Sequence, residues 1–414
     1  MAEPASADPG RRELSRRGLL GPDEGWSLAP VAAWLAIEGR LIGDPEKLLE
    51  GLSARLDAAG ARFDRLNFSV ATLHPQLLAW GCFWKRGDGA AMFLGRHGAQ
   101  NSEAYIGSPL QYVRENQRVL RRQLEGLDEE RDHVFYHEMR AAGMTDYVAA
   151  PMLFGSGTVN VFTAATRAPG GYSEPDVERI QALANLLAPP VEIIEARRMT
   201  LGLLDAFVGP RISERILQGQ VKRGDGDRIE AAFWYSDLRG FTALSESLPA
   251  GELMQLLNEY FEACAAAASA RGGEILQFIG DAALIVFEIK RPGDEQKVCE
   301  DALDAAVDAF SAIAVTNHRR RHAGLREIAF GLGLHLGTVT HANVGAPDRL
   351  AFNVVGPAVN KTARLQAMTK LAGEPLLVSK EFAARVRRPL RSIGHFDLKG
   401  IDGPQEMFTL DEGA

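Results

Sequence analysis

The chain has 414 residues, a formal net charge of −8, 46% hydrophobic residues and 24% charged residues. This composition is typical of folded globular proteins and excludes the fibrous, intrinsically disordered and membrane-embedded classes. The length predicts two domains, and the negative charge argues against general binding to nucleic acid or to an anionic membrane surface.

Residues 1–25 are rich in Ala, Pro, Gly and charged residues, which predicts a mobile tail. They show no basic segment followed by an apolar one, as a secretion signal would. No apolar run in the chain approaches the length that crossing a bilayer requires. We therefore expect a cytoplasmic protein that does not bind membranes.

Residues 26–198 mix helical patterns with apolar residues that recur at every second position, as in FDRLNFSVATL and TVNVFTAAT. An α+β domain is expected. Its last part predicts two strands, a Gly-Gly turn and a helix capped by Ser173, with Asp176 three residues later. This ending resembles a GAF-type sensor domain, which implies an unknown small-molecule ligand. A dimerisation domain that binds nothing is the alternative.

Residues 199–228 predict a linker helix that is broken at Gly209-Pro210. The helix could pair with its copy in a dimer or pack on its own domain, and the pattern is too short to decide. Its apolar positions recur at helical spacing: Met199, Leu203, Phe207, Ile212 and Ile216.

Residues 229–414 predict a second α+β domain in the order strand, helix, two strands, long helix, strand, with further strands after it. A ferredoxin-like βαββαβ fold is the expected arrangement.

Two carboxylates follow strands in this region. Asp237 ends a strand in YSDLRGFT, and Asp281 lies in the Gly-Asp turn of LQFIGDAALIVF. If the two strands are neighbours, the carboxylates converge and could bind divalent ions that bridge substrate phosphates. For either residue alone, a turn or a helix cap would be the better interpretation.

Two further segments carry groups that suit a nucleotide. In FNVVGPAVNKTARLQ, Asn360 and Arg364 lie four residues apart on one helical face, where an amide and a guanidinium can hold a ribose oxygen and a phosphate. In FDLKGIDGPQEMFTL, Lys399 ends a strand and could place a point charge on a terminal phosphate.

These four segments, in this order, resemble the class III adenylate and guanylate cyclases over nearly all of residues 229–410. The resemblance implies a homodimer with composite active sites and two Mg²⁺ or Mn²⁺ ions in each site. It implies catalytic roles for Asn360 and Arg364. The remaining implied positions are Asp237, Leu238 and Asp281 for metal, and Gln277, Asn353, Lys399, Phe241 and Thr242 for the nucleotide.

Gln277 and Asn353 stand where adenylate-producing members have Lys and an Asp or Thr, and they do not match the guanylate pair either. Both amides can donate and accept, so they could serve adenine or guanine. We expect an adenylate cyclase that converts ATP to 3′,5′-cyclic AMP, with regulation by the N-terminal domain as a further expectation. A guanylate or dual-specificity cyclase is one alternative.

Two other classes compete with this interpretation. A catalytically silent cyclase-like module would bind nucleotide or only dimerise. Against it, the matching residue type is present at the five positions implied for metal, ribose and phosphate: Asp237, Asp281, Asn360, Arg364 and Lys399. A diguanylate-forming enzyme would show a GGDEF-like hairpin, whereas the hairpin here is FIGDAA.

Overall fold

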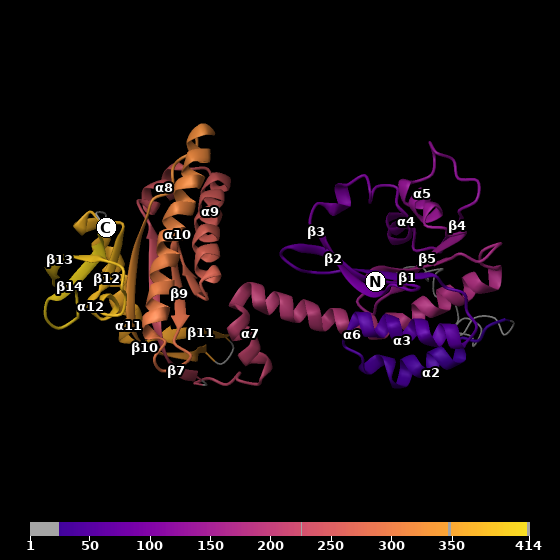
Figure 1. Ribbon diagram of the computed structural model, residues 1–414, viewed down its shortest axis with the longest axis horizontal. Coiled ribbons are helices and arrows are strands. Elements are labelled where there is room, and N and C mark those ends of the chain that lie inside the picture. The colour runs from indigo at the N-terminus through magenta and orange to yellow at the C-terminus, as the bar shows by residue number, and fades with distance from the viewer. Residues whose placement is uncertain (1–24, 225, 347–348, 412–414) are drawn as a thin grey trace, which may run out of the picture. The chain divides into compact units, whose positions relative to one another are not determined.

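A computed structural model of the chain describes residues 25–224, 226–346 and 349–411. The described chain forms two compact α+β units, one ending at Leu203 and the other beginning at Leu204 (Figure 1). Apart from Gly25, the expected mobile tail lies outside the described residues.

The N-terminal unit contains a six-stranded antiparallel sheet in the order β3-β2-β1-β6-β5-β4. Alternate residues of β1 point to opposite faces, so Leu66, Phe68 and Val70 all enter the larger core of this unit. The strands are β1 Arg65–Ala71, β2 Leu77–Lys85, β3 Gly89–Arg96, β4 Leu120–Gln123, β5 Asp146–Leu153 and β6 Val159–Thr166.

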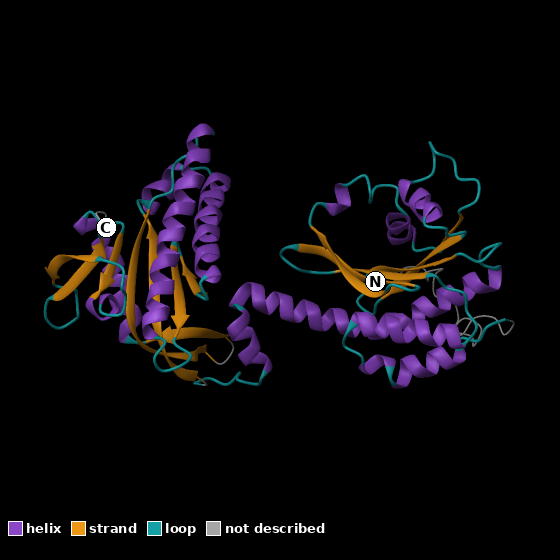
Figure 2. Ribbon diagram, viewed as in Figure 1, coloured by secondary structure: helices purple, strands orange, loops and turns teal. Residues whose placement is uncertain are grey.

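Helices cover both faces of this sheet (Figure 2). The larger core packs one face against α2 Ala29–Ile37, α3 Pro45–Ala58 and the first part of α6 Glu174–Val208. The smaller core packs the other face against α4 Pro109–Asn116 and α5 Val134–Ala141. Two short 3₁₀ helices complete the unit, η1 Gly39–Leu41 and η2 Ala99–Asn101.

Local capping explains where two of these helices begin. Asp44 accepts hydrogen bonds from the backbone N–H groups of Glu46 and Lys47 at 2.9 and 3.2 Å, which starts α3. At α6, the Ser173 Oγ accepts from the Asp176 backbone N–H at 3.3 Å, and the Asp176 carboxylate accepts from the Ser173 backbone N–H at 3.0 Å. The predicted Ser173 cap is confirmed. The GAF-like assignment of the unit stays a prediction.

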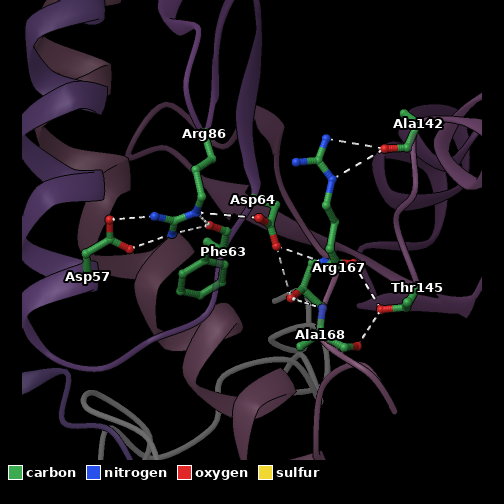
Figure 3. Close-up of polar contacts among 9 residues, drawn as sticks. Asp57, Phe63, Asp64, Arg86, Ala142, Thr145, Arg167 and Ala168 are labelled. Atoms are coloured by element: carbon green, nitrogen blue, oxygen red, sulfur yellow. Dashed lines mark hydrogen bonds and ion pairs between the residues drawn. The ribbon is translucent and has the colours of Figure 1, made fainter.

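A polar network holds one end of this sheet together (Figure 3). Arg86 makes two hydrogen bonds to the Asp57 carboxylate at 2.9 and 2.6 Å, and Asp64 accepts from the Arg167 backbone N–H at 2.7 Å. Arg86 also lies 3.5 Å from Asp64. The network therefore links the end of α3, the end of β2 and the end of β6.

The long helix α6 stops at Val208, and α7 Pro210–Leu217 begins two residues later. Between them Gly209 has a φ of 85°, a left-handed conformation that glycine adopts readily. The predicted break at Gly209-Pro210 is confirmed. The segment 199–228 is divided between the two units, because α6 reaches past Leu203 and Arg211 of α7 pairs with Glu288 of the C-terminal unit at 2.7 Å.

The C-terminal unit contains an eight-stranded sheet in the order β13-β14-β12-β10-β7-β9-β8, with β11 paired to β10. Its first strand, β7, lies between β10 and β9 and pairs antiparallel with both. The strands are β7 Gly226–Leu238, β8 Glu274–Ile279, β9 Ala282–Glu288, β10 Phe330–Ala346, β11 Arg349–Val355, β12 Leu376–Ser379, β13 Leu390–Phe396 and β14 Gln405–Leu410.

Helices α9 Ala250–Ala270 and α10 Glu295–His322 pack on one face of this sheet, where Ala232 and Trp234 of β7 are fully buried. Ile229, Ala231 and Phe233 enter a separate core on the other face, together with Ala358 of α11 Pro357–Ala372. Two short helices, α8 Phe241–Ser247 and α12 Lys380–Ala383, connect the larger elements. Among the helices of the described residues, none combines the length and the apolar character that a membrane span requires.

Candidate functional site

The end of β7 and the turn between β8 and β9 bring Asp237 and Asp281 together. Asp237 pairs with Ala282, the residue after Asp281, and Gly280 makes the turn with a φ of 65°. Burial raises the pKa of Asp237 to about 7, and the hydrogen bond with Asp281 and the charge of Asp281 act in the same direction. The two carboxylates thus meet, as their positions at strand ends predicted.

The chemistry of this pair fits a divalent cation. Two facing carboxylates are hard oxygen donors, and their mutual repulsion falls when a cation lies between them. The Arg239 guanidinium donates to the Thr369 hydroxyl at 2.8 Å, and its charge only partly offsets the rise in the pKa of Asp237. No cluster of three or more metal-binding side chains occurs in the described part of the chain. The protein side of the coordination would therefore be two carboxylates, as is common for Mg²⁺ bound with substrate phosphates.

A buried hydrogen bond fixes the strand that carries Asp237. The Tyr260 hydroxyl of α9 donates to the Ser236 hydroxyl at 2.7 Å, and both side chains are fully buried. The backbone N–H of Leu238 hydrogen-bonds the Asp237 carboxylate, while the Leu238 side chain lies in the core. Leu238 could therefore reach a metal only through its backbone.

Glycines on β10 set the position of α11. A Cβ at Gly333 would lie 2.7 Å from the Thr362 carbonyl oxygen and 2.7 Å from the Gln366 backbone nitrogen, and one at Gly337 would lie 2.7 Å from the Ala358 Cβ. Because β10 has glycine at these positions, the helix packs directly on the strand. This close packing places the start of α11 over the middle of β10.

A pocket of about 800 Å³ opens between β10 and α11. Asn360 and Arg364 line it, as do Arg228, Lys361 and Gly400. The Arg364 guanidinium lies close to Gly400, because a Cβ there would be 3.5 Å from it. Lys399 precedes this glycine and is exposed. The structure thus brings Asn360, Arg364 and the loop that carries Lys399 to one place, with an excess of positive charge.

Three pocket residues form a network that the sequence did not indicate. Lys361 pairs with Glu381 at 2.7 Å, and Glu381 lies 3.7 Å from the Nδ1 atom of His335. His335 also hydrogen-bonds with the Ser379 hydroxyl at 2.8 Å. Burial lowers the pKa of His335 to about 4, and the charge of Lys361 adds to this shift. The imidazole is therefore neutral at neutral pH and serves as a fixed hydrogen-bonding group.

The other predicted nucleotide positions lie outside this pocket. Gln277 is exposed on β8, and Asn353 is half-buried on β11, where its side-chain oxygen accepts from the Val354 N–H at 2.8 Å. Phe241 packs against the core at the start of α8, and the adjacent Thr242 is exposed. Neither Asp237 nor Asp281 lines the pocket. One chain therefore presents its carboxylates and its Asn360–Arg364 face in separate places.

Residues 227–412 match the adenylate and guanylate cyclase catalytic domain family. Residues 227–412 therefore form a domain of this family. Apart from Gly226, the match covers the strands of this cyclase domain from β7 to β14, and it includes every predicted metal and nucleotide position.

Curated relatives match over about half of the chain. An adenylate cyclase of Anabaena cylindrica is 32% identical over 222 residues, which are 52% of this chain and 42% of that protein. Adenylate cyclase 1 of Rhizobium meliloti (strain 1021) is 30% identical over 185 residues, which are 44% of this chain and 28% of that protein. The chain thus spans less than half the length of these relatives.

Solved structures also resemble the cyclase domain. The adenylyl cyclase CyaB from P. aeruginosa is 27% identical, with 46% of this chain and 97% of that chain covered and a TM-score of 0.42. The guanylyl cyclase Cya2 is 29% identical, with 46% and 96% covered and a TM-score of 0.40.

Proposed function

We propose that the chain is an adenylate cyclase that converts ATP to 3′,5′-cyclic AMP and pyrophosphate, with two Mg²⁺ or Mn²⁺ ions at each site of a homodimer. The observation that carries the proposal is the contact between Asp237 and Asp281 on a cyclase domain, where burial and mutual repulsion raise the pKa of Asp237 to about 7. Such a pair is unfavourable by itself and favourable around divalent cations.

Each group of the chain has one task in this reaction. Asp237 and Asp281 hold the ions, which when bound acidify the ribose 3′-hydroxyl and offset the charge of the leaving pyrophosphate. Asn360 orients the ribose through its amide. Arg364 offers a planar fork of donors to the α-phosphate, where charge builds up as the new bond forms. Lys399 adds positive charge at the distal phosphates, and no side-chain nucleophile is required.

The separation of these groups supports a composite site. The carboxylate pair lies outside the pocket that Asn360 and Arg364 line. In a dimer, the carboxylates of the second chain would complete the pocket of the first chain. The carboxylates of the first chain would complete the pocket of the second. Two equivalent sites then form across a two-fold interface.

The pocket network supports the positioning role of α11. Asn360 directly precedes Lys361, whose ammonium is held by Glu381 at 2.7 Å. This ion pair ties the N-terminal part of α11 to α12. We propose that the Lys361–Glu381 ion pair holds the Asn360 side chain in a fixed position in the pocket.

ATP is the proposed substrate because the curated relatives at 30% and 32% identity are adenylate cyclases. The amides of Gln277 and Asn353 also allow guanine, so GTP is the second candidate. Regulation of this activity by the N-terminal unit is part of the same proposal.

A direct assay tests the chemistry. The purified full chain is incubated with ATP or GTP and Mn²⁺, and cyclic nucleotide is measured for the wild type, for Asp281→Ala and for Asp88→Ala, an exposed carboxylate in the N-terminal unit. We expect Asp281→Ala to lower the rate at least about a hundredfold, since metal charge stabilisation contributes several kcal/mol. The Asp88→Ala variant should keep wild-type activity.

Two results would contradict the proposal. Equal product from the wild type and Asp281→Ala would exclude a site built on the carboxylate pair. A folded wild-type chain that forms no cyclic nucleotide from either triphosphate would favour the silent cyclase-like module.

A further inference from the structure

A second cavity lies in the N-terminal unit, between the sheet and the helices α4 and α5. Figure 1 shows these two helices over one face of the sheet. Its volume is about 310 Å³. Small-molecule sites in proteins span about 300–1,000 Å³, so this cavity suits a molecule of one or two rings.

Aromatic rings form much of its wall. Phe83, Phe93 and Phe135 line the cavity from β2, β3 and α5. The Phe93 ring lies directly over Gly81, because a Cβ there would come within 2.3 Å of the ring. Glycine at this position therefore lets the ring lie against the sheet. The resulting walls favour a planar, apolar ligand body.

One wall carries a positive charge without a carboxylate partner. Arg65 lines the cavity from β1, half-buried, and its guanidinium lies 5.8 Å from the Phe83 ring centroid and 3.6 Å from the Met139 sulfur. No carboxylate of the described residues lies within ion-pair distance of it, and Glu138 acts on it only at longer range. Burial lowers the pKa of Arg65, which means that its charged form is less stable here than in water. The guanidinium nevertheless remains charged.

A second cation makes this arrangement more unfavourable. Lys85 of β2 lies directly opposite Arg65 in the strand register, and its ammonium is 5.4 Å from the same Phe83 ring. Like charges directly opposite on neighbouring strands are destabilising. The described residues offer Lys85 no ion pair either. An anion held at this wall would relieve the repulsion.

The remaining polar groups divide into engaged and free ones. The Tyr147 hydroxyl is hydrogen-bonded with Thr163, so this pair is satisfied within the protein. The side-chain amide of Asn67 lines the cavity next to Arg65 on the same face of β1, and the described residues offer it no hydrogen bond. Among the described residues, the Arg65 guanidinium has one hydrogen bond, to the Met139 sulfur, so most of its N–H groups remain available. These groups and the unbonded Asn67 amide match the two oxygens of a carboxylate.

We propose that this cavity binds a small planar aromatic molecule that carries a carboxylate, with the carboxylate on Arg65 and Asn67 and the ring between the phenylalanines. The inference concerns binding alone and is independent of the cyclase activity.

Isothermal titration calorimetry on the full chain tests the proposal with three probes: indole-3-carboxylate, its neutral analogue indole-3-carboxamide, and acetate. We expect indole-3-carboxylate to bind at least tenfold more tightly than either of the other two. Only the first probe combines the charge with the ring.

Variants locate the site. Arg65→Gln removes the charge and should weaken indole-3-carboxylate at least tenfold. Asn67→Asp keeps the size of the side chain, places a negative charge beside the carboxylate, and should weaken the same probe at least as much. Arg62→Gln, at an exposed arginine of the same unit, should leave the affinity unchanged. If circular dichroism shows that Arg65→Gln does not fold, the affinity of Asn67→Asp for indole-3-carboxylate tests the proposal instead.

Four results would overturn the inference. The first is an affinity for indole-3-carboxamide equal to that for indole-3-carboxylate. The second is an equal affinity for acetate, which would indicate an adventitious anion site. The other two are an unchanged affinity for indole-3-carboxylate in the folded Arg65 and Asn67 variants and no binding of any probe.

Discussion

Burial and a neighbouring carboxylate both disfavour the charged form of Asp237. Its folded-state pKa of about 7 is higher than the value of about 3.9 in an unfolded chain. Between these two values the folded protein holds more protons than the unfolded one, so the free energy of unfolding decreases as pH rises from about 4 to about 7. Below this range the carboxyl group is protonated in both states and contributes no pH dependence.

The unfavourable charge on Asp237 beside Asp281 predicts that a bound metal ion stabilises the folded protein. In EDTA, the C-terminal unit should melt at a lower temperature at pH 7.5 than at pH 5.5. At pH 7.5, Mn²⁺ at a hundredfold excess over its dissociation constant should stabilise it by about 2.7 kcal/mol. Differential scanning calorimetry with and without Mn²⁺ measures both effects.

Asp281→Asn is the control for this prediction, because it removes the neighbouring charge and keeps the shape of the turn. The variant should show a smaller loss of stability with rising pH and little response to Mn²⁺. An equal rise in melting temperature in the wild type and the variant would show that Mn²⁺ binds elsewhere.

In our proposal, the side-chain amides of Gln277 and Asn353 select the base of the nucleotide, and substitutions at these two positions test this role. Gln277→Lys combined with Asn353→Asp should raise the ratio of kcat/KM for ATP to that for GTP by about tenfold or more. The lysine can donate to N1 of adenine and the aspartate can accept from the N6 amine, whereas guanine presents the opposite pattern.

The two single variants separate the contributions of Gln277 and Asn353. An unchanged ATP to GTP ratio in the double variant would show that the base is read at other positions.

At the residue scale, local signals predicted that Asp237 and Asp281 meet, and their role at a metal stays a prediction. Asp237 lies at the end of a strand and Asp281 lies in a Gly-Asp turn, and both signals can be read within a few residues. The link from Lys361 to Glu381 joins residues twenty positions apart and depends on how α12 packs beside α11. No periodicity or spacing marks such a contact, so the pocket network could not be predicted.

At the scale of elements, the same distinction holds. The α6 cap at Ser173 and the break at Gly209 follow from side-chain and backbone preferences of the residues themselves. The order of strands in the C-terminal sheet depends on tertiary pairing. β7 is a central strand because β9 and β10, which come later in the sequence, pair with its two edges. The spacing of hydrophobic residues predicts that strands exist but does not fix their neighbours.

The packing of α11 on β10 gives a prediction at this scale. Gly333→Ala would place a Cβ 2.7 Å from the Thr362 carbonyl oxygen, so the helix must move away from the strand. We expect a loss of about 1–3 kcal/mol in the free energy of unfolding, as for other overpacked sites, together with a lower cyclase rate. Urea unfolding and the cyclase assay measure the two effects.

Gly251→Ala is the matched control, because a Cβ at this helical glycine of α9 meets nothing within 4 Å. It should leave activity unchanged and stabilise the unit by up to about 1 kcal/mol. Wild-type activity and stability in Gly333→Ala would show that the glycine does not set the position of α11.

At the scale of the whole molecule, the length of the chain predicted two domains because a single core rarely grows so large. The structure divides the described residues at Leu203 and Leu204, inside a continuous helix. Helical periodicity continues across that point, so no local signal in the sequence marks it. The break that the sequence does mark, at Gly209, lies a few residues later, and α7 beyond it packs on the cyclase domain through Arg211.

The separation of the carboxylate pair from the Asn360–Arg364 pocket leads to a prediction for the assembled protein. If each site takes Asp237 and Asp281 from one chain and Arg364 from the other, two inactive variants can complement each other. Co-expression of Asp281→Ala with Arg364→Ala places about half of the dimers in the mixed form, and each mixed dimer holds one intact site out of two. The mixture should therefore show about a quarter of the wild-type rate.

Co-expression of Asp237→Ala with Asp281→Ala is the matched control, because in that mixture every composite site lacks one of its two carboxylates. It should remain as inactive as either variant alone. If the site were complete within one chain, the first mixture would also remain inactive, since no chain in it would hold both the carboxylate pair and Arg364. Recovery in the first mixture and none in the second would therefore assign the carboxylates and the arginine of one site to different chains.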